Sequence, residues 1–306
     1  MSVLIFVDHT DEGHIKKASH EAISYGAKIA EQIGDVAEAV VLGKVNEDLA
    51  ALGKHGAKKV HHVQNDNLNT LDSQLQAKVI VQVAEQTGAK VIIFSNNSSG
   101  KALAPRVAVR LKAGLVAGAT ALPDTSNGFV VRKNVFSGKA FANVAVNTDP
   151  SEAYQVAFQI AEVAKSGNYD IIFTGKETID YNDGVVGGMI AEFLDLPYIA
   201  QITDFKIAGT TATIKREIEG GEETLEVALP VVVSTQKGVA EARIPNMRGI
   251  MAARTKPLKV VEPAAVESLT KFSEFGLPPA KAGVKLVSPD NVEELVKLLH
   301  EDARAI

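Results

Sequence analysis

Apolar runs alternate with amphipathic stretches in the first third of the chain, a pattern typical of an α/β fold. Residues 2–8 are apolar at almost every position, which is typical of a central strand in a parallel sheet. Residues 14–33 repeat apolar side chains at steps of three and four, which predicts a helix that ends at Gly34. We expect further strands at 37–42, 59–63 and 91–95, a short helix capped by Asn46, and an amphipathic helix at 71–87. Helices between successive strands predict right-handed crossovers.

The second half of the chain repeats part of this layout. The first copy has a helix at 71–87, a strand at 91–95, a polar loop, a helix at 101–112 and a charged hairpin at 129–139. In the second copy, the first helix is at 151–166, the strand at 170–174 and the polar loop at 175–183. The second helix begins at 184, and the hairpin is at 214–225. The second hairpin turns at Gly220 and Gly221 and leads into a buried strand at 230–234. Two related Rossmann-like modules, each with an added antiparallel hairpin, are the simplest explanation. The alternative is that any two α/β units look alike.

The second module has no counterpart of the first seventy or so residues, so three strands and two helices are missing from it. Its sheet would then expose backbone groups along an open edge. A buried donor or acceptor left unpaired costs about 1–3 kcal/mol. We therefore expect this module to complete its sheet with strands from another chain or a swapped copy, and the joint at 148–151 to act as a hinge.

The last part of the chain is rich in proline and alanine. Pro245 is expected to open a helix that runs to Arg254, and residues 262–282 are interpreted as a linker. A strand at 283–287 and a final helix capped by Ser288 would follow. The predicted domains are 1–147, 148–261, and a linker with a C-terminal arm at 262–306.

Composition narrows the class of protein. A chain of 306 residues suggests two domains, and a net charge of −5 argues against general nucleic-acid binding. The absence of cysteine excludes disulfides and thiolate metal sites. No apolar run reaches the length of a membrane span, and the chain enters its first strand without a basic leader. We expect a cytoplasmic protein without membrane insertion.

The loop after the strand at 170–174 is the main candidate site. It lacks the lysine of a P-loop and the Gly-x-Gly-x-x-Gly spacing of a dinucleotide site. The backbone amides of Gly184, Val185, Val186 and Gly187 would hold an adenylate phosphate at the start of a helix. Asp180 would orient the loop or accept a sugar hydroxyl. The alternative is a tight helix entry that packs on the sheet.

A basic stretch at 237–259 is the second candidate. It holds six lysine and arginine residues and one glutamate. Ile244 and Pro245, with Arg248 nearby, fit an apolar anchor with a charged rim that docks a partner protein. The alternative is a solvated face. His61 and His62 are neighbours on a strand and face opposite ways, so they share no metal. No acid–base pair stands out.

Several motifs resemble the electron transfer flavoprotein family. The longest matches its beta subunit: Ile214-x-Arg216-x-x-Glu219-Gly220-Gly221-x-Glu223-x-Leu225, then Pro230-x-Val232-Val233-Ser234. Further beta-like motifs are Thr174-Gly175-Lys176-x-x-Ile179-Asp180, Ile244-Pro245-Asn246 and Pro278-Pro279-x-x-x-Gly283-Val284-Lys285. Residues 1–147 resemble the N-terminal domain of the alpha subunit, through Val3-Leu4-Ile5-Phe6-Val7 and Arg132-Lys133-x-x-x-Ser137-Gly138-Lys139.

The resemblance implies modules of the adenine-nucleotide-binding type and an electron carrier rather than an enzyme. The family passes electrons on FAD from donors such as acyl-CoA dehydrogenases to a quinone oxidoreductase or another acceptor, as in fatty acid β-oxidation. Residues 180–187 would bind AMP or a second FAD, and Ile244 would anchor a dehydrogenase. Neither the alpha subunit's main FAD-holding domain nor the beta subunit's N-terminal half is found. FAD is therefore expected mainly from a domain or chain absent here, with a complementary flavoprotein subunit as heterodimer partner. A non-redox nucleotide-binding module and a structural module of the same fold are the competing interpretations.

Overall fold

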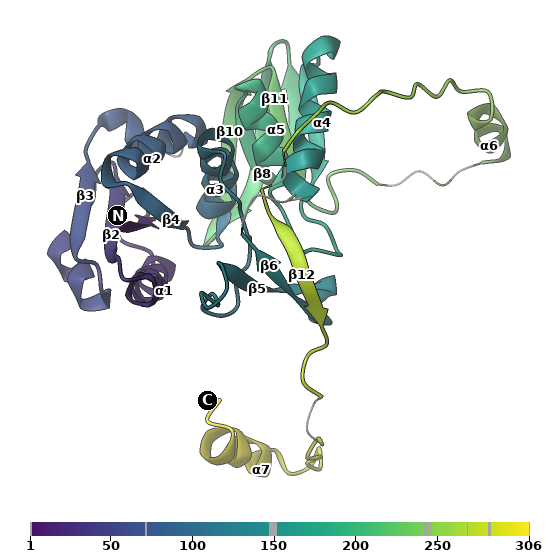
Figure 1. Ribbon diagram of the computed structural model, residues 1–306. Helices are drawn as coiled ribbons and strands as arrows, with labels where there is room; N and C mark the ends of the chain where they lie inside the picture. Colours follow the sequence, from purple (N-terminus) through teal and green to yellow (C-terminus); the bar gives the residue numbers. More distant parts are fainter. Residues whose placement is uncertain are drawn as a thin grey trace. The chain divides into compact units, whose positions relative to one another are not determined.

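The computed structural model describes residues 2–70, 72–146, 152–241, 244, 246–267, 269–280 and 283–305 (Figure 1). The predicted joint at 148–151 and Pro245 lie outside these residues. The chain separates into two compact units, Met1–Gly276 and Leu277–Ile306. The first unit contains both predicted modules, and each unit is described by itself below.

The first module contains a four-stranded parallel sheet, which confirms the α/β prediction. The strand order is β3-β2-β1-β4, with β1 at Ser2–Val7, β2 at Val36–Leu42, β3 at Lys59–Val63 and β4 at Ala89–Ile93. Helix α1, at Lys17–Ile33, packs on the face that carries Val3 and Ile5. Helices α2, at Ser73–Thr87, and α3, at Ser98–Leu111, pack on the face that carries Leu4 and Phe6. Both faces of β1 are buried, which explains its unbroken apolar sequence.

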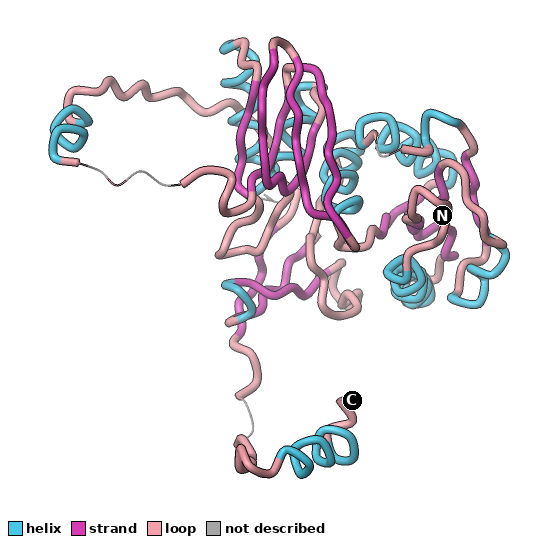
Figure 2. Tube along the Cα trace, turned by 180° about the vertical axis from the view of Figure 1, so that it is seen from behind, coloured by secondary structure: helices cyan, strands magenta, loops and turns pink. Residues whose placement is uncertain are grey.

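The second module contains a five-stranded sheet in the order β10-β9-β8-β11-β7. Its strands are β7 at Ile171–Gly175, β8 at Tyr198–Ala208, β9 at Thr211–Ile218, β10 at Gly221–Ala228 and β11 at Val231–Thr235. The strands β7, β11 and β8 are parallel, and β8, β9 and β10 form an antiparallel meander whose long strands are visible in Figure 2. Helices α4, at Glu152–Gly167, and α5, at Val186–Leu194, pack together beside this sheet.

Strand β8 was not predicted from the sequence. Its alternation is interrupted near Gln201, which adopts a left-handed conformation with φ 59°. The pairing of β8 with both of its neighbours shifts register close to this residue. An irregularity of this kind moves the following side chains to the other face of the sheet, so the strand carries no continuous two-residue pattern.

The hairpin of the first module does not join the parallel sheet. Strands β5, at Val130–Val135, and β6, at Ala140–Ala145, connect through the short 3₁₀ turn η3, at Phe136–Gly138. Strand β12, at Lys271–Gly276, pairs with β6 and completes a separate three-stranded antiparallel sheet. This strand lies inside the segment interpreted as a linker, so that part of the interpretation was wrong. The strand is stabilised by its pairing with β6, a partner far away in the sequence.

The remaining elements differ from the predictions mainly at their ends. The short helix is a 3₁₀ helix, η1 at Leu49–His55, and Asp48 caps it instead of Asn46, whose amide donates to the Glu12 carbonyl. A second 3₁₀ turn, η2, spans Asp66–Leu68, and α6, at Met247–Ala253, is capped by Asn246. In the second unit, Asn291 rather than Ser288 caps α7, at Val292–Lys297, which continues into η4 at Leu298–Asp302. Residues 283–287 form no strand.

A buried ion network joins the two modules through α3 and α5. The Arg106 side chain is fully buried and donates to Glu192 Oε2 at 2.9 Å and to the Leu196 carbonyl at 2.5 Å. Arg110 Nη2 lies 2.6 Å from Glu192 Oε1. Burial lowers the pKa of Arg106, and its hydrogen bond to Glu192 opposes that shift. The buried charge of Arg106, in the first module, is therefore compensated by the Glu192 carboxylate of the second module.

Replacing Glu192 with alanine should destabilise the protein by about 3–5 kcal/mol, because it leaves the buried Arg106 charge without its carboxylate. Urea unfolding would measure the change. The matched control is Glu222→Ala, which removes an exposed pair with Lys215 and should change the free energy of unfolding by about 0–1 kcal/mol. Equal, small losses in both variants would show that the network does not hold the modules together.

Candidate functional site

The predicted site residues lie on the loop between β7 and α5. The Thr178 amide donates to the Asp183 carbonyl at 2.9 Å, which closes the loop on itself. The Phe136 amide donates to the Asp180 carbonyl at 2.8 Å, which ties the loop to the turn between β5 and β6. The loop is therefore held between the second module, which carries it, and the hairpin of the first.

Helix α5 begins without a side-chain cap. Val185 occupies the N-cap position, and its side chain accepts no hydrogen bond because it has no polar atom. The amides at the start of a helix have no acceptor within the helix itself. The first turn of α5 therefore retains donors for a ligand, aided by the positive end of the helix dipole.

A cavity of about 220 Å³ lies beside this helix start. Its wall comes from the loop, from α4 and α5, from β5 and β6, and from β12 with its preceding residue. The lining residues are Leu115, Val116, Lys133, Val144, Ala153, Val156, Thr178, Asp180, Tyr181, Asp183, Val186, Thr270 and Phe272. The predicted residues Asp180 and Val186 thus share one cavity. Gly184, Val185 and Gly187 do not line it.

The charges in the cavity are mostly paired or negative. Lys133 is 2% exposed and forms an ion pair with Asp183 across the two modules. Desolvation acts to raise the pKa of Asp180, but hydrogen bonds from the Tyr181 amide and the Thr178 hydroxyl outweigh it and leave the pKa below its usual value. Asp180 is therefore a carboxylate at neutral pH. Such an oxygen accepts hydrogen bonds from hydroxyl groups and repels an adjacent phosphate.

One wall of the cavity is aromatic. The Tyr181 and Phe272 rings stack with their centroids 4.6 Å apart, and Phe272 stacks in turn on Phe275 at 5.4 Å. Stacked rings of this kind offer a flat apolar surface. The wall joins the loop of the second module to β12.

Two glycines, Gly184 in the loop and Gly187 in the first turn of α5, leave no room for a side chain. A side chain at Gly184 would lie 2.7 Å from the Lys176 carbonyl oxygen, and one at Gly187 would lie 2.7 Å from Thr174 Oγ1 and 2.8 Å from the Tyr198 ring. The expected alternative role, a tight helix entry against the sheet, is therefore present at Gly187, whereas Gly184 packs against the loop itself. Any nucleotide contact would come in addition to this packing.

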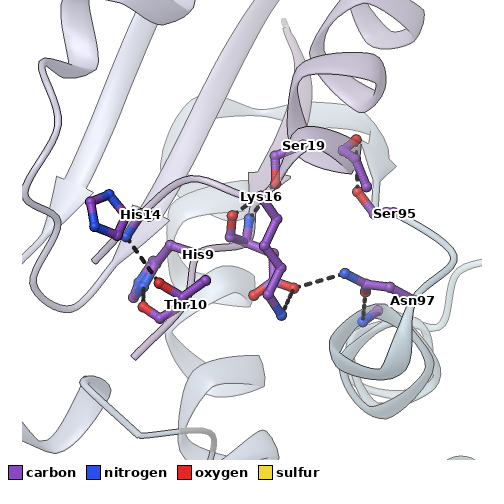
Figure 3. Close-up of polar contacts among 10 residues, drawn as sticks. His9, Thr10, His14, Lys16, Ser19, Ser95 and Asn97 are labelled. Atoms are coloured by element: carbon purple, nitrogen blue, oxygen red, sulfur yellow. Dashed lines mark hydrogen bonds and ion pairs between the residues drawn. The ribbon is translucent and has the colours of Figure 1, made fainter. Parts of the chain in front are cut away.

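A second polar cluster lies where β1 and β4 end in the first module (Figure 3). The Asp8 carboxylate pairs with Lys16 Nζ at 2.9 Å and accepts from Asn97 Nδ2 at 2.8 Å, and Asn97 also caps α3. Ser19 donates to the Asp8 carbonyl, and Ser95 donates to the Ala18 carbonyl. Parallel sheets commonly bind ligands at such a point, where successive strands lie on opposite sides of β1. In this cluster the polar groups bind one another and hold α1 and α3 against the sheet.

Residues 244 and 246–259 of the predicted docking segment are exposed. Ile244 is 92% exposed, and Arg248 lies in α6 on the same exposed segment. Met247 and Met251 of α6 are also exposed, at 73% and 65%. Flexible, polarizable methionine side chains are common on protein-binding surfaces. An apolar group with a basic neighbour therefore remains available in this chain.

Comparison with known sequences shows which family this is. A sequence model described as the electron transfer flavoprotein domain matches residues 3–151 and again residues 148–266. The chain belongs to the electron transfer flavoprotein domain family. The two successive matches also agree with the internal repeat.

Three relatives are named electron transfer flavoprotein subunit beta. One from Syntrophomonas wolfei is 43% identical over 44% of this chain and 54% of its own length. One from Bacillus subtilis is 34% identical over 54% of this chain and 68% of its own length, and the human one is 33% identical over 53% and 66%. The chain thus spans about half to two thirds of these relatives.

In this electron transfer flavoprotein domain, sequence reasoning missed the cavity residues that lie outside the loop and α5. Lys133 occupies an inward position of β5, between the buried Val131 and Val135. A charged residue at such a position was a usable signal. Phe272 carried none, because nothing in the sequence brings β12 to the loop. The described residues hold no group of three metal ligands and no helix long and apolar enough to cross a membrane.

Replacing Gly187 with alanine should destabilise the protein by about 1–3 kcal/mol, because the added methyl group overlaps Thr174 and Tyr198. Thermal or urea unfolding would measure this. The control is Gly53→Ala in η1, where a side chain meets nothing within 4 Å, and it should be neutral or stabilising by up to about 1 kcal/mol. An unchanged stability for the Gly187 variant would mean that α5 moves freely against the sheet.

Proposed function

We propose that this chain is a component of an electron transfer flavoprotein that binds an adenylate beside α5 and docks redox partners through residues 244–254. Membership of the family supports this assignment, and the uncapped start of α5 next to the cavity is the observation that carries the nucleotide site. In this proposal, the chain binds an adenylate and positions redox partners, and it performs no reaction on a substrate.

In this proposal, each part of the nucleotide has its own place at the cavity. The phosphate lies at the first turn of α5, at Val186, where the helix dipole favours an anion. The ribose hydroxyls donate to Asp180, whose lowered pKa keeps it ionised. The base packs along the Tyr181–Phe272 wall. Since ligand pockets usually span about 300–1,000 Å³, this smaller cavity holds only part of the nucleotide.

A flavin is the group that carries electrons in this proposal. FAD supplies one- and two-electron transfer when it is bound. The described cavity is too small to enclose FAD. A complementary flavoprotein subunit therefore supplies most of the FAD site, and this chain contributes the adenylate site, for AMP or the adenylate part of a second FAD. The donor is an acyl-CoA dehydrogenase and the acceptor a quinone oxidoreductase or a similar protein.

The docking role rests on exposure and charge. Ile244 has almost no contact with the rest of the chain, which an anchor for a partner's pocket requires. Arg248 and the neighbouring lysines form a basic rim that selects an acidic partner surface and speeds its approach.

Replacing Val186 with aspartate should weaken AMP binding by about 1–4 kcal/mol, because a carboxylate would face the phosphate at the helix start. Calorimetry with AMP would measure this. The control is Val186→Asn, which has nearly the same shape without the charge and should bind AMP more tightly than the aspartate variant. Aspartate is favourable in a first helical turn, so folding should not suffer from the charge. Equal affinity for both variants would place the phosphate elsewhere and favour a purely structural role for the loop.

Replacing Ile244 with alanine should weaken binding to an acyl-CoA dehydrogenase by about 1–3 kcal/mol, the scale of losing one aliphatic anchor. Surface plasmon resonance would measure the affinity. The melting temperature should not change, since the side chain is 92% exposed. The control is Leu258→Ala, an equally exposed residue beyond α6. Loss of binding in both variants alike would point to a diffuse contact rather than an anchor.

A further inference from the structure

Helices α2 and α4 carry the same apolar pattern but differ in burial. Alanine, isoleucine and valine occur at matching positions of the two helices, at Ala77, Ile80 and Val83 and at Ala157, Ile160 and Val163. Both alanines are fully buried. Ile80 and Val83 are 0% and 7% exposed, whereas Ile160 and Val163 are 39% and 43% exposed. One helix has covered its apolar face, and its repeat has not.

The first module shows what covers that face. Ile80 and Val83 belong to a buried cluster with Leu4 of β1 and Val40 of β2. Strand β1 also pairs in parallel with β4, the strand that follows α2. The first two strands of the module therefore lie under α2, and β1 also lies along the edge of β4.

In the second module, no described strand occupies the corresponding place. Strand β7 follows α4 as β4 follows α2, and it stands at the end of the strand order, paired only with β11 among the described residues. The Asp170 carbonyl accepts a hydrogen bond from the Val231 amide of β11, and the Thr174 carbonyl accepts one from the Thr235 hydroxyl. Because backbone groups alternate along a strand, the amide and carbonyl of Phe173 face the other edge.

Both sides of this edge are apolar. Ile160 and Val163 lie on the helical side, and the Phe173 side chain, 53% exposed, lies on the opposite side against Phe205. An open strand edge with apolar groups above and below it is suited to adding a strand whose both faces are apolar. Strand β1, buried at each of its six residues, is a strand of that kind.

We propose that this edge binds a β-α-β unit of a separate polypeptide, whose first strand pairs in parallel with β7 and whose second strand lies under α4. The partner is a chain with apolar strands like β1 and β2. A second copy of this protein fits less well, because its β1 is already paired with β2 on one edge and β4 on the other. The proposal is independent of the nucleotide and of the docking segment.

The first test completes the module within one chain. A copy of residues 2–70 is inserted before Ser151, so that the inserted copy of β3 precedes α4 at the spacing at which β3 precedes α2. The substitutions Ile160→Asp and Val163→Asp are then made separately in the native and in the extended protein. Each substitution should lower the melting temperature of the extended protein by about 5 °C or more and leave that of the native protein unchanged. The control, Ile207→Asp at the exposed end of β8, should change neither melting temperature.

Equal effects in both proteins would mean that the α4 face is already covered, and no effect in the extended protein would mean that the unit does not dock; either result overturns the proposal.

The native chain provides a second test by amide exchange. The Phe173 amide should exchange much faster than the Ile172 amide, which faces β11. Slow exchange at both positions, or a dimer in light scattering that protects Phe173, would show that the chain itself or a second copy occupies the edge.

Discussion

The buried guanidinium of Arg106 is the constraint on which the arrangement of the two modules depends. A charge with no exposed surface has to find a carboxylate, and the one it reaches, Glu192, belongs to the other module. This pair sets α5 against α3, and Gly188 allows the two helices to approach closely because a side chain there would meet Pro105 at 3.0 Å. Helix α5 in turn carries the loop that forms one wall of the cavity.

The cavity exists because three separate parts of the chain meet at this loop. The hairpin of the first module supplies Lys133, the loop supplies Asp183, and β12 adds Phe272. The Lys133–Asp183 pair neutralises a charge that would otherwise attract anions into the cavity, so among the described residues around it the start of α5 is the remaining anion-binding feature. In the proposed nucleotide site, this arrangement separates a place for phosphate from a place for hydroxyl groups.

The internal repeat makes the second module informative by comparison with the first. In α2, Ile80 and Val83 are buried against β1 and β2, whereas the matching Ile160 and Val163 of α4 are exposed. The chain belongs to a family whose domain it matches twice, yet only the first match has the strands β1 to β3. An open strand edge flanked by apolar side chains favours association, because its backbone groups and apolar faces lack a partner strand. The exposed side of α4 and β7 is thus a binding surface created by what the second module lacks.

The sequence by itself determined the local elements, the repeat and the family. Strand β1, helix α2, the hairpin at Gly220 and the buried strand β11 were predictable because their patterns depend on neighbours within a few residues. The tertiary structure decided the elements that depend on distant partners. Strand β12 forms only because β6 pairs with it, β8 contains an irregularity at Gln201, and residues 283–287 form no strand, although their local sequence resembles one. The cavity likewise required Lys133 and Phe272 to meet the loop, and no local pattern encodes such a meeting, since it results from packing between modules.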